Sequence, residues 1–251
     1  MGFACYEWYD ISLERLIMKN VKLTLLATLA LVGASFATTI NGPSLQGVLN
    51  DITNDGSSSV NTATDQVAAD KYWQLTASGT SAATMIIEVA GFASSNTFGI
   101  YDVYNPSSKV TLFQGSATGG DQVAVSIKAS GAVYLNNVNT GVVFGGNTFG
   151  YFLQGPGGTF YSDDALNGGV DHMVAFQGTG DLVTLPTLFP GTWTPNEYIL
   201  GWEDLAGGDN DFNDMVVMVE SVKPVPEPTT MGLMGLGLIG LMFAARRNKK
   251  A

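Results

Sequence analysis

The chain has 251 residues, a formal net charge of −11, and one residue each of Cys and His. This acidity argues against nucleic-acid binding, which needs a basic face to displace counterions from phosphates. A single Cys excludes an intramolecular disulfide and a multi-Cys zinc site, and a single His excludes a multi-His metal site. Hydrophobic residues make up 45% of the chain, which is enough to fill a core.

The N-terminal region is typical of an export signal. Residues 18–37 contain a short basic stretch, an apolar run over 23–31 and a small-residue cleavage motif. The predicted signal peptidase site is formed by Ser35, Ala37 and Thr38. A buried helix is the alternative interpretation. Residues 1–17 carry three acidic residues, which signal peptides normally lack, so we interpret them as a mis-called upstream extension.

The central region predicts an all-β fold. Residues 38–70 are rich in Asn, Ser, Thr and Asp, and we expect a loose polar leader or an edge segment there. Short runs rich in β-branched and aromatic residues follow, separated by turn-forming clusters. The expected strands are 71–78, 83–92, 98–104, 122–129, 132–135, 148–154, 172–177, 197–202 and 212–220. The expected turns are 105–108, 118–121, 155–158 and 207–210. This spacing predicts one jelly-roll-like β-sandwich domain over 71–222.

An acidic segment near the end of this region is the candidate metal site. Five carboxylates and two Asn amides fall within 12 residues around a Gly pair: Glu203, Asp204, Asp209, Asn210, Asp211, Asn213 and Asp214. Calcium takes six to eight oxygen ligands, so the pattern predicts calcium as the cofactor, although its spacing differs from that of an EF-hand. A second acidic loop offers Asp163 and Asp164 as further ligands. The alternative is a set of solvated turn carboxylates.

Five short stretches of the central region resemble one bacterial family. They are 149–153, 158–164, 169–173, 200–205 (Leu-Gly-Trp-Glu-Asp-Leu) and 208–217 (Gly-Asp-Asn-Asp-Phe-Asn-Asp-Met-Val-Val). Over 145–220 they are similar to the "domain of unknown function 4114" family. The resemblance implies a secreted or surface protein and supplies no reaction.

The sequence predicts no catalytic residues. His172 and Asp171 are adjacent, and neighbouring residues on a strand point to opposite faces, so they do not make a catalytic pair. No G-x-S-x-G motif is present. A secreted hydrolase with paired acids remains a lesser alternative. A carbohydrate-binding module is the stronger one, with candidate glycan-stacking residues Trp73, Trp193, Trp202 and Tyr198; their alternative role is core packing.

The C-terminal region 223–251 is a second targeting signal. Pro226, Glu227 and Pro228 precede an apolar segment over 231–245, which ends at Arg246 and Arg247. This order resembles the PEP-CTERM sorting signal. The resemblance implies transient anchoring in the inner membrane through a transmembrane helix, recognition by an exosortase, and cleavage near the motif. It also implies a Gram-negative host that makes extracellular polysaccharide. A plain single-pass anchor is the alternative.

The predicted mature part, residues 38–228, is far more acidic than the whole chain suggests. It holds four basic and 19 acidic residues, a net charge of −15. Such a surface attracts cations. We therefore expect an exported, non-catalytic protein of the cell surface or extracellular matrix. We expect it to bind calcium and to associate with exopolysaccharide or biofilm, and not with nucleic acid.

Overall fold

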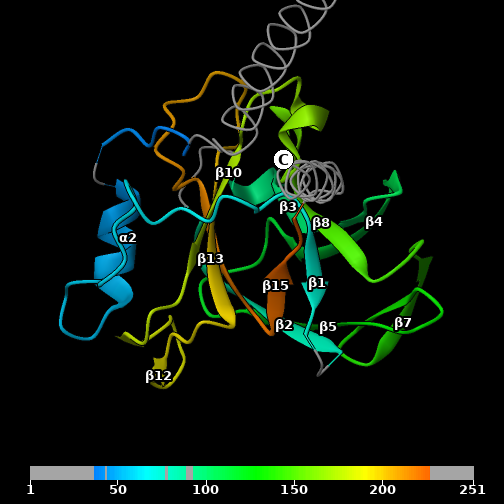
Figure 1. Cartoon of the computed structure of the whole chain (residues 1–251), viewed down its shortest axis with the longest axis horizontal. Coiled ribbons are helices and arrows are strands. Elements are labelled where there is room, and N and C mark those ends of the chain that lie inside the picture. The colour runs from blue at the N-terminus through cyan, green and yellow to red at the C-terminus, as the bar shows by residue number, and fades with distance from the viewer. Residues whose placement is uncertain (1–36, 43, 77–78, 89–92, 227–251) are drawn as a thin grey trace, which may run out of the picture. The chain divides into compact units, whose positions relative to one another are not determined.

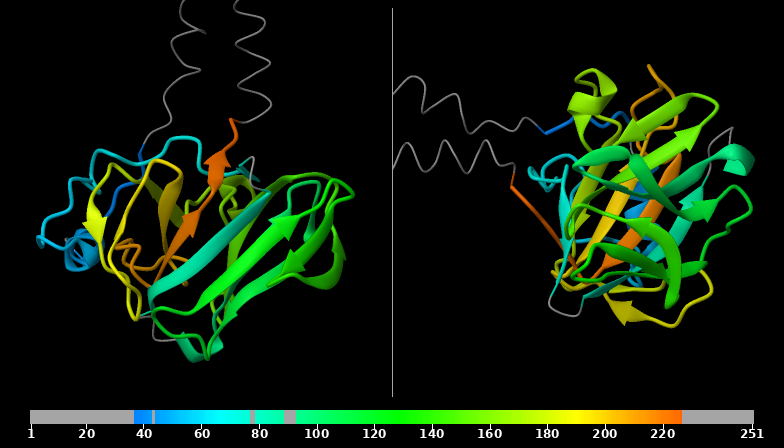
Figure 2. Two further views of the ribbon diagram at one scale, coloured as in Figure 1. Left: turned by 90° about the horizontal axis from the view of Figure 1, so that it is seen from below. Right: turned by 90° about the vertical axis from the view of Figure 1, so that its right-hand side faces the viewer.

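The computed structural model describes residues 37–226, except 43, 77–78 and 89–92. These residues form one compact unit with its own hydrophobic cores (Figures 1 and 2). Its helical elements are α2 (Ser44–Ile52), η1 (Ala93–Ser95) and η2 (Asp164–Asn167). Its strands are β1 (Trp73–Leu75), β2 (Thr80–Glu88), β3 (Thr97–Asp102), β4 (Asn105–Gln114), β5 (Gln122–Ile127), β6 (Ala132–Leu135), β7 (Val138–Val143), β8 (Thr148–Gly155), β9 (Gly158–Tyr161), β10 (Met173–Gln177), β11 (Leu182–Val183), β12 (Gly191–Thr192), β13 (Glu197–Trp202), β14 (Met215–Glu220) and β15 (Val222–Pro224).

Two large antiparallel sheets make up most of the body, and β11 and β12 form a separate two-stranded sheet. The first, sheet I, has the strand order β15-β1-β8-β3-β4, with β9 paired to β8. The second, sheet II, has the order β10-β13-β14-β2-β5-β6-β7. A core that includes Phe98 and Tyr151 from sheet I and Leu200 and Val217 from sheet II joins the two. The predicted all-β, jelly-roll-like sandwich is therefore confirmed.

Alternating side chains explain why these segments form strands. Val123, Val125 and Ile127 of β5 all lie in the core between the sheets, as their period of two predicts. Strand β14 is apolar at every position from Met215 to Val219 because both its faces are buried. Its alternate residues enter two different cores, one between the sheets and one on the outer face of sheet II.

Helix α2 covers part of that outer face (Figure 1). Its Leu45, Leu49 and Ile52 are buried in a second core with Phe176 of β10 and Ile199 of β13. Part of the segment that we expected to be a loose leader or an edge segment is thus a helix packed on the sheet. This helix was not expected, because nine residues are too short to show a sustained helical period.

The turn predictions are only partly correct. The segments 118–121 and 155–158 form turns, the second closing the β8–β9 hairpin with Gly155 opposite Gly158. The turn expected at 105–108 is wrong, because those residues begin β4, and Val103 and Tyr104 make the β3–β4 connection instead. Strand β7 was also not expected. Both misses involve polar residues on strands with exposed positions, where hydrophobic alternation is weak.

Candidate metal site

The acidic loop between β13 and β14 brings three carboxylates together. Oxygen atoms of Glu203, Asp209 and Asp211 lie within 4.8 Å of one another. Glu203 follows the buried end of β13, which fixes its position, whereas Asp209 and Asp211 belong to the loop. The loop borders a pocket of about 440 Å³, lined by Glu203, Asp204, Leu205, Gly207, Gly208, Asp209 and Asp214.

Glu203 is the buried member of the group. Its side chain is 2% exposed, and its Oε1 accepts a hydrogen bond from the Phe212 backbone N–H at 2.8 Å. Its Oε2 is buried and has no hydrogen-bond partner among the described residues. Burial raises the pKa of Glu203, and the nearby charges of Asp209 and Asp211 raise it further. A buried carboxylate oxygen without a partner is costly, and a bound cation would compensate it.

A glycine makes room for this carboxylate. A Cβ added at Gly208 would lie 2.3 Å from Glu203 Oε2, which is closer than any real contact. The loop also contains two non-glycine residues in the left-handed region, Asn210 with φ of 60° and Phe212 with φ of 53°. Phe212 is fully buried in the outer core, and this anchors the tip of the loop.

The remaining acidic residues of the loop adjoin the group. Asp214 Oδ2 accepts a hydrogen bond from the Asp204 backbone N–H at 3.0 Å, and Asp204 Oδ2 accepts one from the Asn96 side chain at 3.0 Å. Burial, together with the charges of Asp204 and Glu203, raises the pKa of Asp214 to about 7. Asn213 donates to Asp211 Oδ2 at 2.7 Å and so orients that carboxylate.

Residues far away in sequence hold the loop, and sequence reasoning missed them. Asn41 donates through its backbone N–H to Asn210 O at 2.7 Å and through its side chain to Asp209 O at 2.6 Å. Ser44, the first residue of α2, donates through its hydroxyl to Asp211 Oδ2 at 2.7 Å. These contacts span more than 160 residues, so no local pattern signals them.

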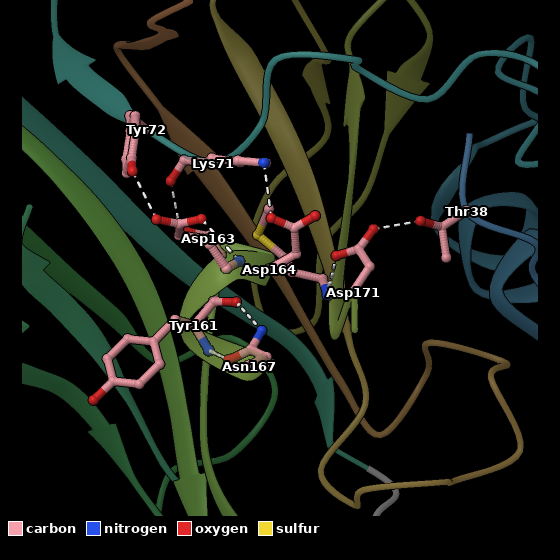
Figure 3. Close-up of polar contacts among 11 residues, drawn as sticks. Thr38, Lys71, Tyr72, Tyr161, Asp163, Asp164, Asn167 and Asp171 are labelled. Carbon is pink, nitrogen blue, oxygen red and sulfur yellow. Dashed lines mark hydrogen bonds and ion pairs between the residues drawn. The ribbon is translucent and has the colours of Figure 1, made fainter. Parts of the chain in front are cut away.

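The second acidic loop does not join this group. Asp163 Oδ2 accepts a hydrogen bond from Tyr72 at 2.6 Å, and its Oδ1 accepts from Ala165 N at the start of η2 (Figure 3). Asp164 forms an ion pair with Lys71 at 2.7 Å. The two carboxylates predicted as further metal ligands therefore have protein partners.

The predicted glycan-stacking residues are core residues. Trp73, Trp193 and Trp202 are fully buried and Tyr198 is 4% exposed. Trp73 packs edge-to-face on Tyr198 with ring centroids 5.0 Å apart. Their ring faces contact the protein interior and are not open to a sugar. The prediction of a glycan site at these residues is therefore wrong, and core packing is what their apolar area provides.

His172 is also a structural residue. It is 4% exposed and stacks on Phe160 with ring centroids 3.8 Å apart. Its Nδ1 lies 3.4 Å from Glu203 O, and burial lowers its pKa. Asp171 bonds instead to the Thr38 hydroxyl and to the Met173 N–H. The two side chains thus have separate partners. Both residues precede β10, so the strand alternation that we expected for them does not apply.

Comparisons with known proteins agree with the sequence motifs. Residues 224–248 match the PEP-CTERM protein-sorting motif, and residues 118–222 match the Domain of unknown function (DUF4114). The chain carries a PEP-CTERM sorting motif, and its body is similar to the DUF4114 family. The DUF4114 match begins earlier than the stretches that suggested it and includes the acidic loop. The sorting motif implies export and membrane-anchored sorting to the cell surface by an exosortase.

Beyond these two motifs, similarity to known proteins is low. No curated protein shows a significant match. One solved structure, the Chromobacterium violaceum lectin CV2L in complex with alpha-methyl-fucoside, is 13% identical, with 62% of this chain and 97% of the lectin covered and a TM-score of 0.27. A likeness at this level says nothing about what the present chain binds.

The predicted membrane and cleavage segments lie largely outside the described residues. These segments are 1–36, which hold most of the signal peptide, and 227–251, which hold the apolar segment 231–245 and Arg246 and Arg247. Between residues 37 and 226, no described helix has the length and apolar character needed to cross a bilayer.

Proposed function

We propose that this protein acts outside the cell as a non-catalytic surface or matrix protein whose acidic loop binds calcium. The carrying observation is the Oε2 atom of Glu203, which is buried without a hydrogen-bond partner beside Asp209 and Asp211. Three carboxylates this close repel one another in the absence of a cation. A divalent ion would offset that repulsion, and the buried oxygen would coordinate it.

The donor set favours calcium over other metals. Every side-chain ligand in the group is a carboxylate oxygen, a hard donor that suits calcium or magnesium and not zinc or copper. Calcium tolerates irregular loop geometry, whereas magnesium demands a near-ideal octahedron. Backbone carbonyls and water would complete the coordination of an ion held by Glu203, Asp209 and Asp211.

Calorimetric titration of residues 38–226 with calcium and with magnesium tests the site. We expect binding of calcium, a higher melting temperature with calcium than with chelator, and weaker binding of magnesium. Asp209→Asn should weaken calcium binding by at least tenfold, since it removes one charged ligand. Asp121→Asn is the matched control, because Asp121 lies in an exposed turn, where its side chain accepts a hydrogen bond from Thr118 N. No heat and no melting shift at millimolar calcium would refute the site.

The charge of the body suggests how it would associate with polysaccharide. The mature part carries a net charge of −15, so an acidic polymer is repelled unless cations lie between the two. We propose that calcium bridges the protein to acidic exopolysaccharide in a biofilm matrix. Co-sedimentation with such a polymer should then require calcium and be lost on Asp209→Asn. Binding that persists in chelator would contradict the bridge without bearing on the metal site itself.

A further inference from the structure

Thr38, the first residue of the predicted mature chain, is bound to the fold at two points. Its hydroxyl donates a hydrogen bond to Asp171 Oδ2, and its carbonyl oxygen accepts one from the Gln66 side chain at 2.7 Å. Figure 3 shows the Thr38 side chain pointing at the Asp171 carboxylate. The other oxygen of that carboxylate accepts the Met173 N–H at 3.2 Å. The cleavage position is therefore held against an acidic side chain.

The surroundings of Asp171 carry more negative than positive charge. Asp70 and Asp164 interact unfavourably with Asp171, and Lys71 pairs with Asp164 at 2.7 Å. Burial raises the pKa of both Asp70 and Asp171, and neighbouring carboxylates raise each further. His172 adds little positive charge, because burial lowers its pKa. One more cation at this position would lower the electrostatic energy of the folded protein.

We propose that signal-peptide cleavage supplies this cation: the new α-ammonium group of Thr38 forms an ion pair with Asp171. In the uncleaved chain the Thr38 nitrogen belongs to a neutral peptide bond. Hydrolysis of the Ala37–Thr38 bond adds water, leaves the carboxylate on Ala37 and leaves a protonated amine on Thr38. That amine is in the same residue whose hydroxyl already contacts the carboxylate. Cleavage during export thus adds one positive charge beside the Asp171 carboxylate.

The inference rests on the proposed export only through the position of the cleavage. A recombinant chain can therefore test the ion pair independently. One protein would begin at Thr38, and its partner would carry Gly-Ser-Gly-Ser before Thr38, which moves the ammonium group away. Both would end at Pro226, since residues 37–226 form a compact unit with their own cores. At pH 6 we expect the extended chain to melt about 2–4 °C lower, the shift of a single modest ion pair in a domain of this size.

Two variants and one pKa measurement test whether the melting difference arises from the ion pair with Asp171. Asp171→Asn should abolish the difference between the two N-termini, whereas Asp121→Asn should preserve it. The pKa of the Thr38 amine, measured by NMR, should lie above its ordinary value of about 8 and return to it in Asp171→Asn. Equal melting temperatures for the two N-termini, or an unshifted amine pKa, would overturn the ion pair. N-terminal sequencing of the exported protein should begin at Thr38, and a different first residue would overturn the role of cleavage while leaving the recombinant result intact.

Discussion

Buried carboxylates differ in their hydrogen-bond partners in this molecule. Asp163 has hydrogen-bond donors on both carboxylate oxygens, from Tyr72 and Ala165, and it caps a short helix. Glu203 has a donor on one oxygen, while the other is buried beside two further carboxylates. The first carboxylate is satisfied by protein, and the second is left for a cation. The number of hydrogen-bond donors to a carboxylate therefore distinguishes a structural residue from a candidate metal ligand better than its charge does.

The raised pKa of Asp214 predicts how the free energy of unfolding depends on pH. This pKa is about 7 in the folded protein, against an ordinary value of 3.8. Between about pH 4 and about pH 7 the folded state therefore binds more protons than the unfolded state, and the free energy of unfolding falls as the pH rises through this window. In chelator, Asp214→Asn should flatten this fall, measured by urea unfolding at pH 5 and pH 7.5.

Comparing the parent with Asp214→Asn isolates the effect of Asp214 from that of His172. His172 contributes in the opposite direction, because its pKa is lowered in the folded state and its protonation disfavours folding at acid pH. It is present in both proteins, so its effect cancels in the difference. Identical pH slopes for the parent and Asp214→Asn would show that this carboxyl titrates normally.

At the scale of elements, α2 links the N-terminal segment to the acidic loop. Its apolar face covers sheet II, and its first residue, Ser44, bonds to Asp211. The preceding Asn41 bonds to the backbone of the same loop. The helix therefore stabilises the loop conformation through contacts that a strand-only description of the fold would omit.

Shortening a buried side chain of this helix should lower the stability of the protein. Leu49 is fully buried, so Leu49→Ala removes apolar contacts and leaves a cavity, and it should lower the free energy of unfolding by about 2–5 kcal/mol. Leu166→Ala is the matched control, because Leu166 is 42% exposed and should change the stability little. Urea unfolding measures both. A loss for Leu49→Ala no larger than for the control would mean that the helix contributes little to stability.

At the scale of the whole molecule, charge is divided between body and ends. Of the 11 basic residues, four lie in residues 38–228, the predicted mature part, which carries a net charge of −15. Basic residues near the apolar ends suit membrane insertion and orientation, and an acidic body suits a cation-rich exterior. The targeting signals and the working domain thus have opposite electrostatic requirements, which the chain meets in separate segments.

The sorting motif makes a prediction for the full chain. Glu227→Ala in the Pro226-Glu227-Pro228 motif should block processing, so the product should keep its C-terminal tail and remain in the membrane fraction. Intact-mass measurement and fractionation of the native host detect both effects, with Asp121→Asn as the control that should be processed normally. Release of a tail-less Glu227→Ala protein would contradict the role of this motif.

Features that depend on near neighbours in the chain could be predicted from the sequence. Alternation at Val123, Val125 and Ile127 predicts a strand, a Gly-rich cluster predicts the turn at 155–158, and the order of the C-terminal residues predicts the sorting signal. Each of these rests on residues within one short window, so local propensity and spacing are sufficient. The clustering of acids around a Gly pair likewise identified the candidate loop.

Which of those residues share a site depends on how the chain packs in three dimensions. The tertiary structure separated Asp163 and Asp164 from the acidic loop and placed Trp73, Trp193 and Trp202 in the core. It also brought Ser44 to Asp211 and Thr38 to Asp171, pairs separated by 167 and 133 positions. The physical reason is that burial and partner choice arise when sheets and helix pack, and a short sequence window contains no record of what will pack against it.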